Sequence, residues 1–243
     1  MPTRVLFLAL LGLATASCTT TAPPTAAPPT VALVAAMTAI SGALPTHAEI
    51  RAAYDAIDTS GNGAIDQNEW RNASLALFAI TDKNHDGVIE RAEIGNNAMM
   101  REAFPSVDEG HNGKLTKDEF LELRATIFRA ADIDHNDYIT YVEYELLVLL
   151  RRTGWIDRDK DGRIEMSELR TVLEQAFKLL DANHDGALTG DETAFLAPAH
   201  LTAMDPKNTG RITLEQLING YRFLLGADQV NRNVVSRGFT LPP

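Results

Sequence analysis

Between about residues 47 and 226, apolar side chains form helical segments that alternate with short polar stretches. Each polar stretch has an aliphatic residue at its eighth position, and that residue recurs every 24 to 26 positions. The seven are Ile65, Ile89, Leu115, Ile139, Ile164, Leu188 and Ile212. Seven recurrences at almost one spacing indicate an internal repeat, which covers roughly three quarters of the chain.

Large apolar residues flank each polar stretch, which is twelve residues long. The stretches open with Asp58, Asp82, Asp108, Asp132, Asp157, Asp181 and Asp205. Four positions earlier stand Tyr54, Phe78, Phe104, Phe128, Phe177 and Leu201, with Thr153 as the exception. Directly after the twelve stand Trp70, Ile94, Phe120, Tyr144, Leu169 and Leu217, with Thr193 as the exception. We expect these side chains to face the core between helices, although a groove for a partner would use the same residue types.

The spacing of the stretches predicts helices that are shared between neighbours. Only 12 to 14 residues separate the end of one stretch from the next opening aspartate, which is too few for two helices and a turn. Residues 67–81 would form one such helix, about 22 Å long. Neighbouring loops then lie at opposite helix ends, unless a helix breaks at Gly95, Gly154 or Pro198. The spacing does not determine which loops face each other.

The chemistry is clearest in residues 157–168, DRDKDGRIEMSE. Calcium takes six to eight oxygen ligands, and alternate residues of a tight loop point Asp157, Asp159 and Asp161 inward. Gly162 permits the positive-φ turn, the carbonyl of Arg163 faces the ion, and Glu168 binds with both oxygens. The stretch resembles the calcium-binding loop of the EF-hand superfamily, with loops similar to those of calmodulin. We therefore predict an all-α array of about seven EF-hand loop–helix repeats with short shared helices.

Three further loops keep the central glycine and a full ligand set, so we expect them to bind Ca²⁺. The first offers Asp58, Ser60, Asn62, the Ala64 carbonyl and Glu69; the second offers Asp82, Asn84, Asp86, the Val88 carbonyl and Glu93; the sixth offers Asp181, Asn183, Asp185, the Ala187 carbonyl and Glu192.

The other three loops depart from the pattern. The fourth keeps Asp132, Asp134, Asn136, the Tyr138 carbonyl and Glu143, but Asp137 replaces the glycine at a cost of roughly 1 kcal/mol. The third keeps Asp108, Asn112, the Lys114 carbonyl and Glu119, but Gly110 supplies no ligand, so its occupancy stays open. The seventh has Lys207 and Gln216 at ligand positions, and we expect a folded, empty hand that caps the array.

The charge of the chain is consistent with cation sites. The formal net charge is −11, and without residues 1–17, which carry only Arg4, it becomes −12. A face that binds nucleic acid must be basic, so nucleic acid is not an expected partner.

Four histidines share one position of the loops. They are His85, His111, His135 and His184, all at loop position 4. We expect solvent exposure there, with proton or transition-metal sensitivity as the alternative.

The amino terminus predicts export. Residues 1–17 resemble a lipoprotein-type signal peptide, with Arg4, an apolar run and then small residues before Cys18, the only cysteine. We expect lipidation of Cys18, with a simple cleaved signal as the alternative. We expect residues 18–30 to form a Pro/Thr/Ala-rich tether and residues 31–226 to form the EF-hand repeat domain, with a short helix at 31–44. Residues 227–243 lack a helical period, and we expect them to form a tail.

The chain resembles exported bacterial EF-hand repeat lipoproteins. The resemblance implies a calcium-binding protein, sensor or buffer, membrane-anchored at the periplasmic or outer surface of the cell envelope, with five or six sites. The alternative is a structural or adhesive module that calcium stiffens, or a subunit that binds an envelope protein partner. No catalytic grouping is evident in the sequence, so no enzymatic activity is expected.

Overall fold

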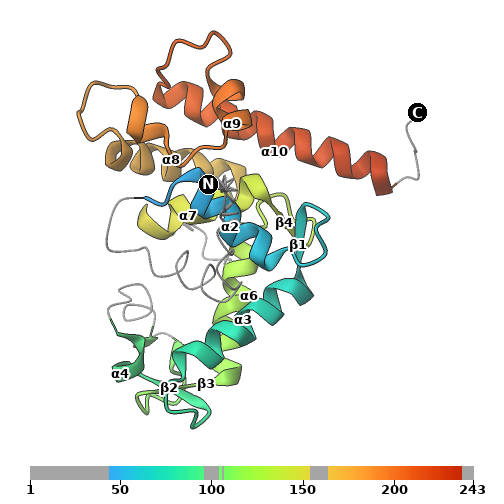
Figure 1. Cartoon of the computed structure of the whole chain (residues 1–243), viewed down its shortest axis with the longest axis vertical. Helices are drawn as coiled ribbons and strands as arrows, with labels where there is room; N and C mark the ends of the chain where they lie inside the picture. Colours follow the sequence, from blue (N-terminus) through green and yellow to red (C-terminus); the bar gives the residue numbers. More distant parts are fainter. Residues whose placement is uncertain (1–43, 96–103, 106, 154–163, 237–243) are drawn as a thin grey trace, which may run out of the picture.

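The computed structural model describes residues 44–95, 104–105, 107–153 and 164–236. The part of the protein within these ranges is mostly helical, as predicted, with four strands of three residues each (Figure 1). In chain order the elements are α2 (His47–Ile57), β1 (Ala64–Asp66), α3 (Gln67–Thr81), β2 (Val88–Glu90), α4 (Arg91–Ile94), β3 (Lys114–Thr116), α6 (Lys117–Ala131), β4 (Tyr138–Thr140), α7 (Tyr141–Thr153), α8 (Met166–Leu180), the 3-10 helix η2 (Gly190–Thr193), α9 (Pro198–Met204) and α10 (Leu214–Ser236).

Helices shared between loops are confirmed. Helix α3 spans the predicted residues 67–81, leaving loop 1 and entering loop 2. Helix α6 connects loops 3 and 4 in the same way, and α8 leads into loop 6. Two of the three expected breaks are confirmed, because α4 ends before Gly95, whose φ is +60°, and α9 begins at Pro198. Gly154 lies outside the described residues. Each shared helix therefore holds loops at its two ends.

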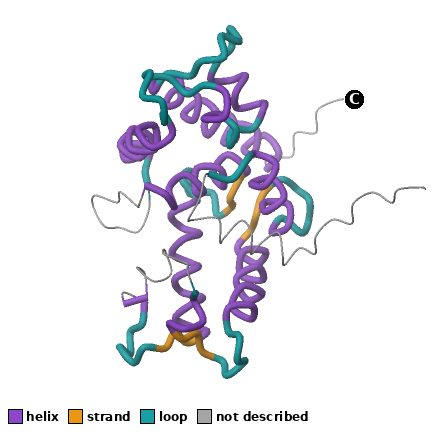
Figure 2. Tube along the Cα trace, turned by 60° about the vertical axis from the view of Figure 1, so that its left-hand side comes forward, coloured by secondary structure: helices purple, strands orange, loops and turns teal. Residues whose placement is uncertain are grey.

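Strand pairing shows which loops face each other. Strands β1 and β4 pair antiparallel, which joins loops 1 and 4, and β2 pairs with β3, which joins loops 2 and 3. A single bridge between Leu188 and Ile212 joins loops 6 and 7. Since the two strand pairs lie at opposite ends of α3 and α6, these helices run antiparallel side by side, as Figure 2 shows.

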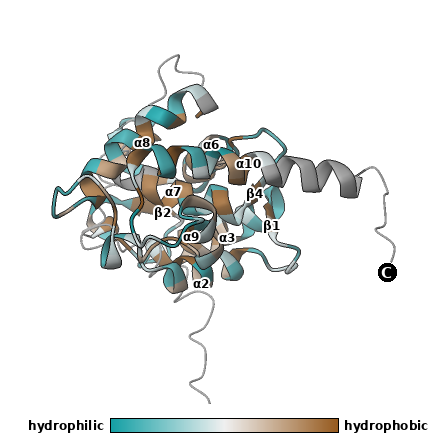
Figure 3. Ribbon diagram, turned by 90° about the horizontal axis from the view of Figure 1, so that it is seen from above, coloured by the Kyte–Doolittle hydropathy of each residue, from teal (hydrophilic) through white to brown (hydrophobic). Residues whose placement is uncertain are grey.

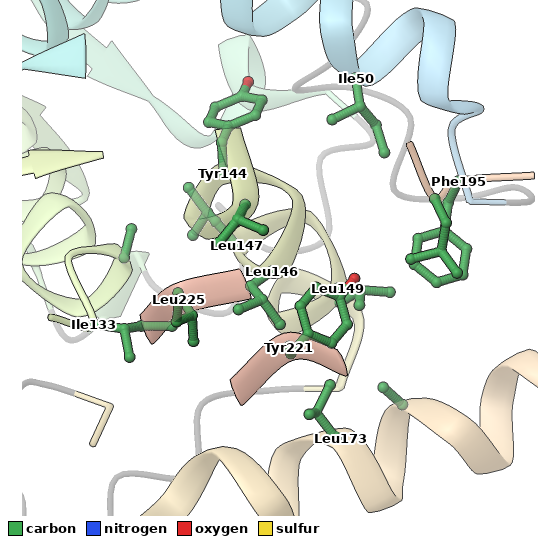
Figure 4. Close-up of a cluster of buried hydrophobic side chains, with 14 of the residues drawn as sticks. Ile50, Ile133, Tyr144, Leu146, Leu147, Leu149, Leu173, Phe195, Tyr221 and Leu225 are labelled. Carbon is green, nitrogen blue, oxygen red and sulfur yellow. The ribbon is translucent and has the colours of Figure 1, made fainter. Parts of the chain in front are cut away.

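Six of the seven aliphatic residues at loop position 8 face each other in the three described loop pairs. All seven are buried, and the flanking large apolar residues are buried too, except that Leu201 is half-buried. They divide into two main clusters. The larger joins α2, α7, α8 and α10 around Tyr144, Leu146 and Tyr221 (Figure 4), and the smaller lies around Ile89 and Leu115 at the loop 2–loop 3 end. In Figure 3 hydrophobic stretches face inward and hydrophilic ones gather on the projecting loops.

A buried acid ties the last hands to the centre. The Glu145 side chain on α7 is fully buried and accepts hydrogen bonds from the Ala197 N–H (3.0 Å) and the Tyr221 hydroxyl (2.8 Å). His200 Nδ1 lies 2.8 Å from the same carboxylate. Because an unpaired buried carboxylate is costly, these partners fix α9 and α10 against α7.

The helix ends follow the sequence signals in part. Thr46 and Glu49 form a capping box at the start of α2. The prediction for the carboxyl-terminal tail is wrong as far as Ser236, because α10 continues through residues 227–236 as one helix of 23 residues.

No helix in the described part of the chain is both long and apolar enough to cross a membrane. The predicted signal segment, Cys18, the tether and most of the helix at 31–44 lie outside the described residues.

Candidate metal sites

The opening aspartate anchors each loop through backbone donors. Asp58 accepts hydrogen bonds from the N–H groups of Asn62 (3.2 Å) and Gly63 (2.9 Å), four and five positions later. The equivalent pairs of bonds form at Asp82, Asp108, Asp132 and Asp181. These donors curl the backbone around the aspartate, so that its carboxylate lies at the middle of the turn.

The closing glutamate faces the same centre from the next helix. Glu69 accepts the N–H of Asp66 (3.0 Å) at the helix start and the N–H of Ser60 (2.8 Å) across the loop. The same cross-loop arrangement occurs at Glu93, Glu119, Glu143 and Glu192. The structure thus brings the two ends of loops 1, 2, 3, 4 and 6 together, as an oxygen cage for one cation requires.

The intermediate side chains complete these cages. At position 5, an oxygen of Asn62, Asp86, Asn112, Asn136 or Asp185 accepts the N–H of the residue two places later, at position 7. This bond fixes the side chain inside the turn, and the position-7 residues Ala64, Val88, Lys114, Tyr138 and Ala187 lie where the sequence predicts carbonyl ligands. At position 3, the Ser60 hydroxyl donates to Asp58 (3.2 Å), and the Asn84 and Asn183 oxygens each accept a loop N–H.

Position 6 adopts the left-handed conformation in every described loop. Gly63 has φ +79° and Gly87 has φ +87°, values that suit glycine. In loop 4, Asp137 adopts the same conformation at φ +66°, so the departure seen in the sequence bends the backbone as glycine would. Its carboxylate accepts a hydrogen bond from the Gln67 side-chain amide (3.1 Å) on the paired loop 1.

Loop 4 contains the most developed acidic cluster among the described residues. One ligand oxygen from each of Asp132, Asp134 and Glu143 lies within 4.8 Å of the other two. Two oxygens that each lie about 2.3–2.6 Å from one Ca²⁺ are at most about 5.2 Å apart, so the separations fit a shared cation. Asp134 Oδ1 is buried and has no hydrogen-bond partner among the described atoms. A cation at this position would satisfy that oxygen.

Buried like charges perturb the acids of loop 4. Burial raises the pKa of Glu143 from its ordinary 4.5 to about 7; the Thr140 N–H opposes the rise, and the charges of Asp134 and Asp132 add to it. Burial also raises the pKa of Asp134, and the charge of Asp132 contributes. Such carboxylates are held in an environment that favours either a proton or a bound cation. The sequence places loop 4 behind loops 1, 2, 5 and 6, whereas its burial makes it the best supported site in the described structure.

The closing acids of three exposed loops behave differently. Backbone N–H donors lower the pKa of Glu93 and Glu192, with the largest contributions from Glu90 and Thr189. The Thr116 hydroxyl lowers the pKa of Glu119. These groups therefore remain ionised well below neutral pH and are ready to bind a cation there.

Loop 5 lies mostly outside the described residues. Asp157, Asp159, Asp161 and Arg163 fall in the range 154–163, so their placement as ligands stays a prediction. Glu168, which closes the loop, is buried and accepts the N–H of Glu165 (3.2 Å). Ile164 is fully buried, as the equivalent residues of the other loops are.

Loops 3 and 7 have the folded form with fewer ligands. A Cβ placed on Gly110 would lie 3.1 Å from Asn112 Nδ2 and 3.9 Å from Asp108 Oδ1, so a side chain there would point into the cage. In loop 7, Asp205 still accepts the Gly210 N–H (2.8 Å), and Gln216 accepts the Thr213 N–H (3.0 Å). An amide thus replaces the closing acid in capping the helix without supplying charge.

The four histidines at position 4 are exposed, as predicted. His85, His111, His135 and His184 all have positive φ values, between +47° and +59°. Their rings lie on the outside of the turn and do not contribute to the cages.

Three contacts between paired loops were not predicted. They join Gln67 to Asp137, Lys114 to Glu90 and Arg211 to Asp185. These contacts depend on which loops pair. The repeat spacing does not determine the pairing, so the sequence could not predict them.

Comparison with known families supports the same chemistry. The family model described as EF hand matches residues 50–74, 156–173 and 173–196. These segments contain loops 1, 5 and 6, and the matches support a place for the chain in the EF-hand superfamily. EF-hand loops bind calcium, so the matches also support calcium binding by this chain. No curated protein matches the chain.

Proposed function

We propose that this protein is a non-enzymatic calcium-binding protein with five or six EF-hand sites. Further, we propose that it is exported and held at the bacterial cell envelope through lipid on Cys18. The observation that carries calcium binding is loop 4, where Asp134 Oδ1 is buried without a partner beside Asp132 and Glu143. The placement at the envelope rests on the sequence of residues 1–30 alone.

The residues that would hold each ion are the side-chain oxygens at positions 1, 3 and 5, the carbonyl at position 7 and the glutamate at position 12. A bound Ca²⁺ supplies two positive charges among carboxylates that otherwise repel one another. The chain's own contribution is to hold those oxygens in place through the backbone donors to the opening aspartate and the closing glutamate. Binding is therefore coupled to the stability of the fold.

The bound ions could serve a sensor or buffer, or they could stiffen a structural or partner-binding module. The shared helices favour the second role. Opening of a sensor hand moves its helices apart, but α3 belongs to loops 1 and 2 and α6 to loops 3 and 4. Moving either helix at one end disturbs the loop at its other end. This coupling supports a calcium-stiffened structural or partner-binding module, whereas the number of sites supports a buffer or sensor.

A calcium titration followed with a hydrophobic dye separates these roles. New apolar exposure on filling is expected of a sensor, and none is expected of a buffer or a stiffened scaffold. Capture of an envelope protein with calcium, and its loss with a chelator, would assign the partner-binding role. The exported setting suggests dissociation constants of about 10⁻⁴–10⁻³ M.

Thermal unfolding tests calcium binding itself. With millimolar calcium, the melting temperature should exceed that in excess chelator by at least about 4 °C, because several sites bind only the folded chain. Magnesium at the same concentration is the control for general ionic effects. An identical melting curve in calcium and in chelator contradicts the proposal.

A further inference from the structure

In two of the three loop pairs, the hand with fewer ligands places a cation on its partner. Loop 3 lacks the position-3 ligand, and Lys114 Nζ at its position 7 lies 2.9 Å from Glu90 Oε1 of loop 2. Loop 7 lacks the closing acid, and Arg211 Nη1 at its position 7 lies 3.1 Å from Asp185 Oδ2 of loop 6. Two independent pairs thus show one arrangement.

The strand pairing explains why position 7 reaches the partner loop. Lys114 stands directly opposite Glu90 in the register of β2 and β3. Arg211 directly precedes Ile212, which forms the bridge to Leu188 of loop 6. Loops 1 and 4, which both have full ligand sets, carry the uncharged Ala64 and Tyr138 at position 7. Among the loop pairs that the structure describes, a cation at position 7 therefore occurs only where one hand is degenerate; Arg163 of loop 5 occupies the same position but lies outside the described residues.

Both carboxylates contacted by these cations lie in loops that are predicted to bind calcium, and one of the two is itself a predicted ligand. Asp185 is the position-5 ligand of loop 6, so Arg211 and Ca²⁺ would compete for the same group. Glu90 is at position 9 of loop 2, where the ligand acts through water. The Lys114 ammonium therefore lies beside the carboxylates of loop 2.

We propose that Lys114 and Arg211 are tethered counter-ions that lower the calcium affinity of loops 2 and 6 and stabilise these loops when calcium is scarce. The inference rests on the proposed calcium binding. It means that the degenerate loops 3 and 7 adjust the calcium affinity of their partner loops. Without calcium, each cation offsets repulsion among clustered carboxylates. With calcium bound, that repulsion is already relieved, so the cation only adds repulsion toward the ion.

The two effects have opposite signs, which distinguishes this role from an ordinary surface salt bridge. Removing the cation should raise calcium affinity and lower the stability of the calcium-free protein. A salt bridge that merely supports the fold would lower stability and leave affinity unchanged or reduced. Because both pairs are partly exposed, the effects should be modest and sensitive to salt.

The test compares Arg211→Gln with Lys207→Gln in the full chain. Both changes remove one positive charge from loop 7, but Lys207 forms no ion pair with loop 6 within the described residues. A calcium titration followed by NMR at the Gly186 amide reports loop 6 alone. At about 10 mM salt, Arg211→Gln should tighten binding about two- to five-fold more than Lys207→Gln does, and about 0.5 M salt should abolish the difference.

A second pair of variants applies the same test to loop 2. Lys114→Gln should tighten calcium binding at loop 2, which the Gly87 amide reports. Lys117→Gln, which like Lys114 lies in loop 3, is the control. In excess chelator, Lys114→Gln and Arg211→Gln should each lower the melting temperature by about 1–3 °C relative to their controls.

Equal effects of the test and control variants, or weaker calcium binding in the test variants, would overturn the inference while leaving the proposed function intact. An unresponsive Gly186 amide in the unmodified chain would instead remove loop 6 from the proposed sites. The inference for Arg211 would then fail with it.

Discussion

Burial separates Glu143 from the closing acids of the exposed loops. Its carboxylate is almost completely buried beside Asp132 and Asp134, and its pKa rises to about 7, whereas hydrogen bonds lower the pKa of Glu93 and Glu192. A closing glutamate that looks the same in six loops of the sequence thus has two electrostatic behaviours. The difference comes from the covering helices, which only the fold reveals.

The stability of the calcium-free protein should fall as pH rises from about 5 to about 7. In that window folded Glu143, with its pKa of about 7, keeps a proton that the unfolded chain, titrating near 4.5, has lost. The buried charge that forms by pH 8 costs up to about 3 kcal/mol. Urea unfolding in chelator at pH 5, 6, 7 and 8 measures this contribution.

Glu143→Gln is the matched variant for that measurement. It should flatten the decline between pH 5 and pH 7 and make the calcium-free protein more stable at pH 8, while removing one calcium site. The same pH dependence in the variant and the unmodified chain would show that Glu143 is not responsible.

Gly110→Asp should strengthen the calcium site of loop 3. Gly110 does not have a positive φ, and an added side chain would point toward Asp108 and Asn112, which needs to shift by only a few tenths of an ångström. Restoring the missing carboxylate should improve the affinity of this loop roughly ten-fold. Gly113→Asp is the control, since its φ of +78° makes any side chain strained. Calorimetric titration distinguishes a gain from no change.

At the scale of the elements, α3 and α6 connect two separate hydrophobic clusters. Trp70 packs on Phe128 at the end near loops 1 and 4, with ring centroids 6.0 Å apart, and Phe78 packs on Phe120 at the other end, 5.5 Å apart. Arg124 lies over the Trp70 ring at 4.2 Å, between these contacts. The helix pair therefore spans two cores, one at each end.

Phe78→Ala should destabilise the loop 2–loop 3 end more than the rest of the molecule. Phe78 is buried in the smaller cluster, and removing its ring costs about 3–5 kcal/mol. Hydrogen exchange should accelerate in β2 and β3 more than at Leu188 and Ile212. Phe177→Ala, the equivalent change in the larger cluster, should reverse that order. Uniform acceleration in both variants would mean that the two clusters unfold as one unit.

At the scale of the whole molecule, local patterns predicted local structure well. The aliphatic residues at loop position 8 are buried, helix α3 has the predicted bounds, and α4 ends before Gly95 as expected. Helix bounds and loop ligands depend on residues that are close in the sequence, so the sequence alone predicts them. The pairing of loop 1 with loop 4 is a long-range property, and it was not predictable from a repeat whose members look alike.

The same distinction explains the candidate sites. The ligand types of loops 1, 2, 3, 4 and 6 were predicted, and the structure brings them together. The burial of Asp134 and Glu143 and the contacts of Lys114 and Arg211 depend on tertiary packing. The extension of α10 to Ser236 was missed because residues 227–236 lack an amphipathic period, although the helix continues without a break.

Calcium stoichiometry, measured by isothermal titration of the full chain, tests the proposed function most directly. Five or six ions should bind, and Glu168→Gln, Glu143→Gln and Glu192→Gln should each remove one, whereas Gln216→Ala should remove none. Binding of no calcium at millimolar concentrations, or a stoichiometry that these variants leave unchanged, would contradict the assignment of the loops as calcium sites.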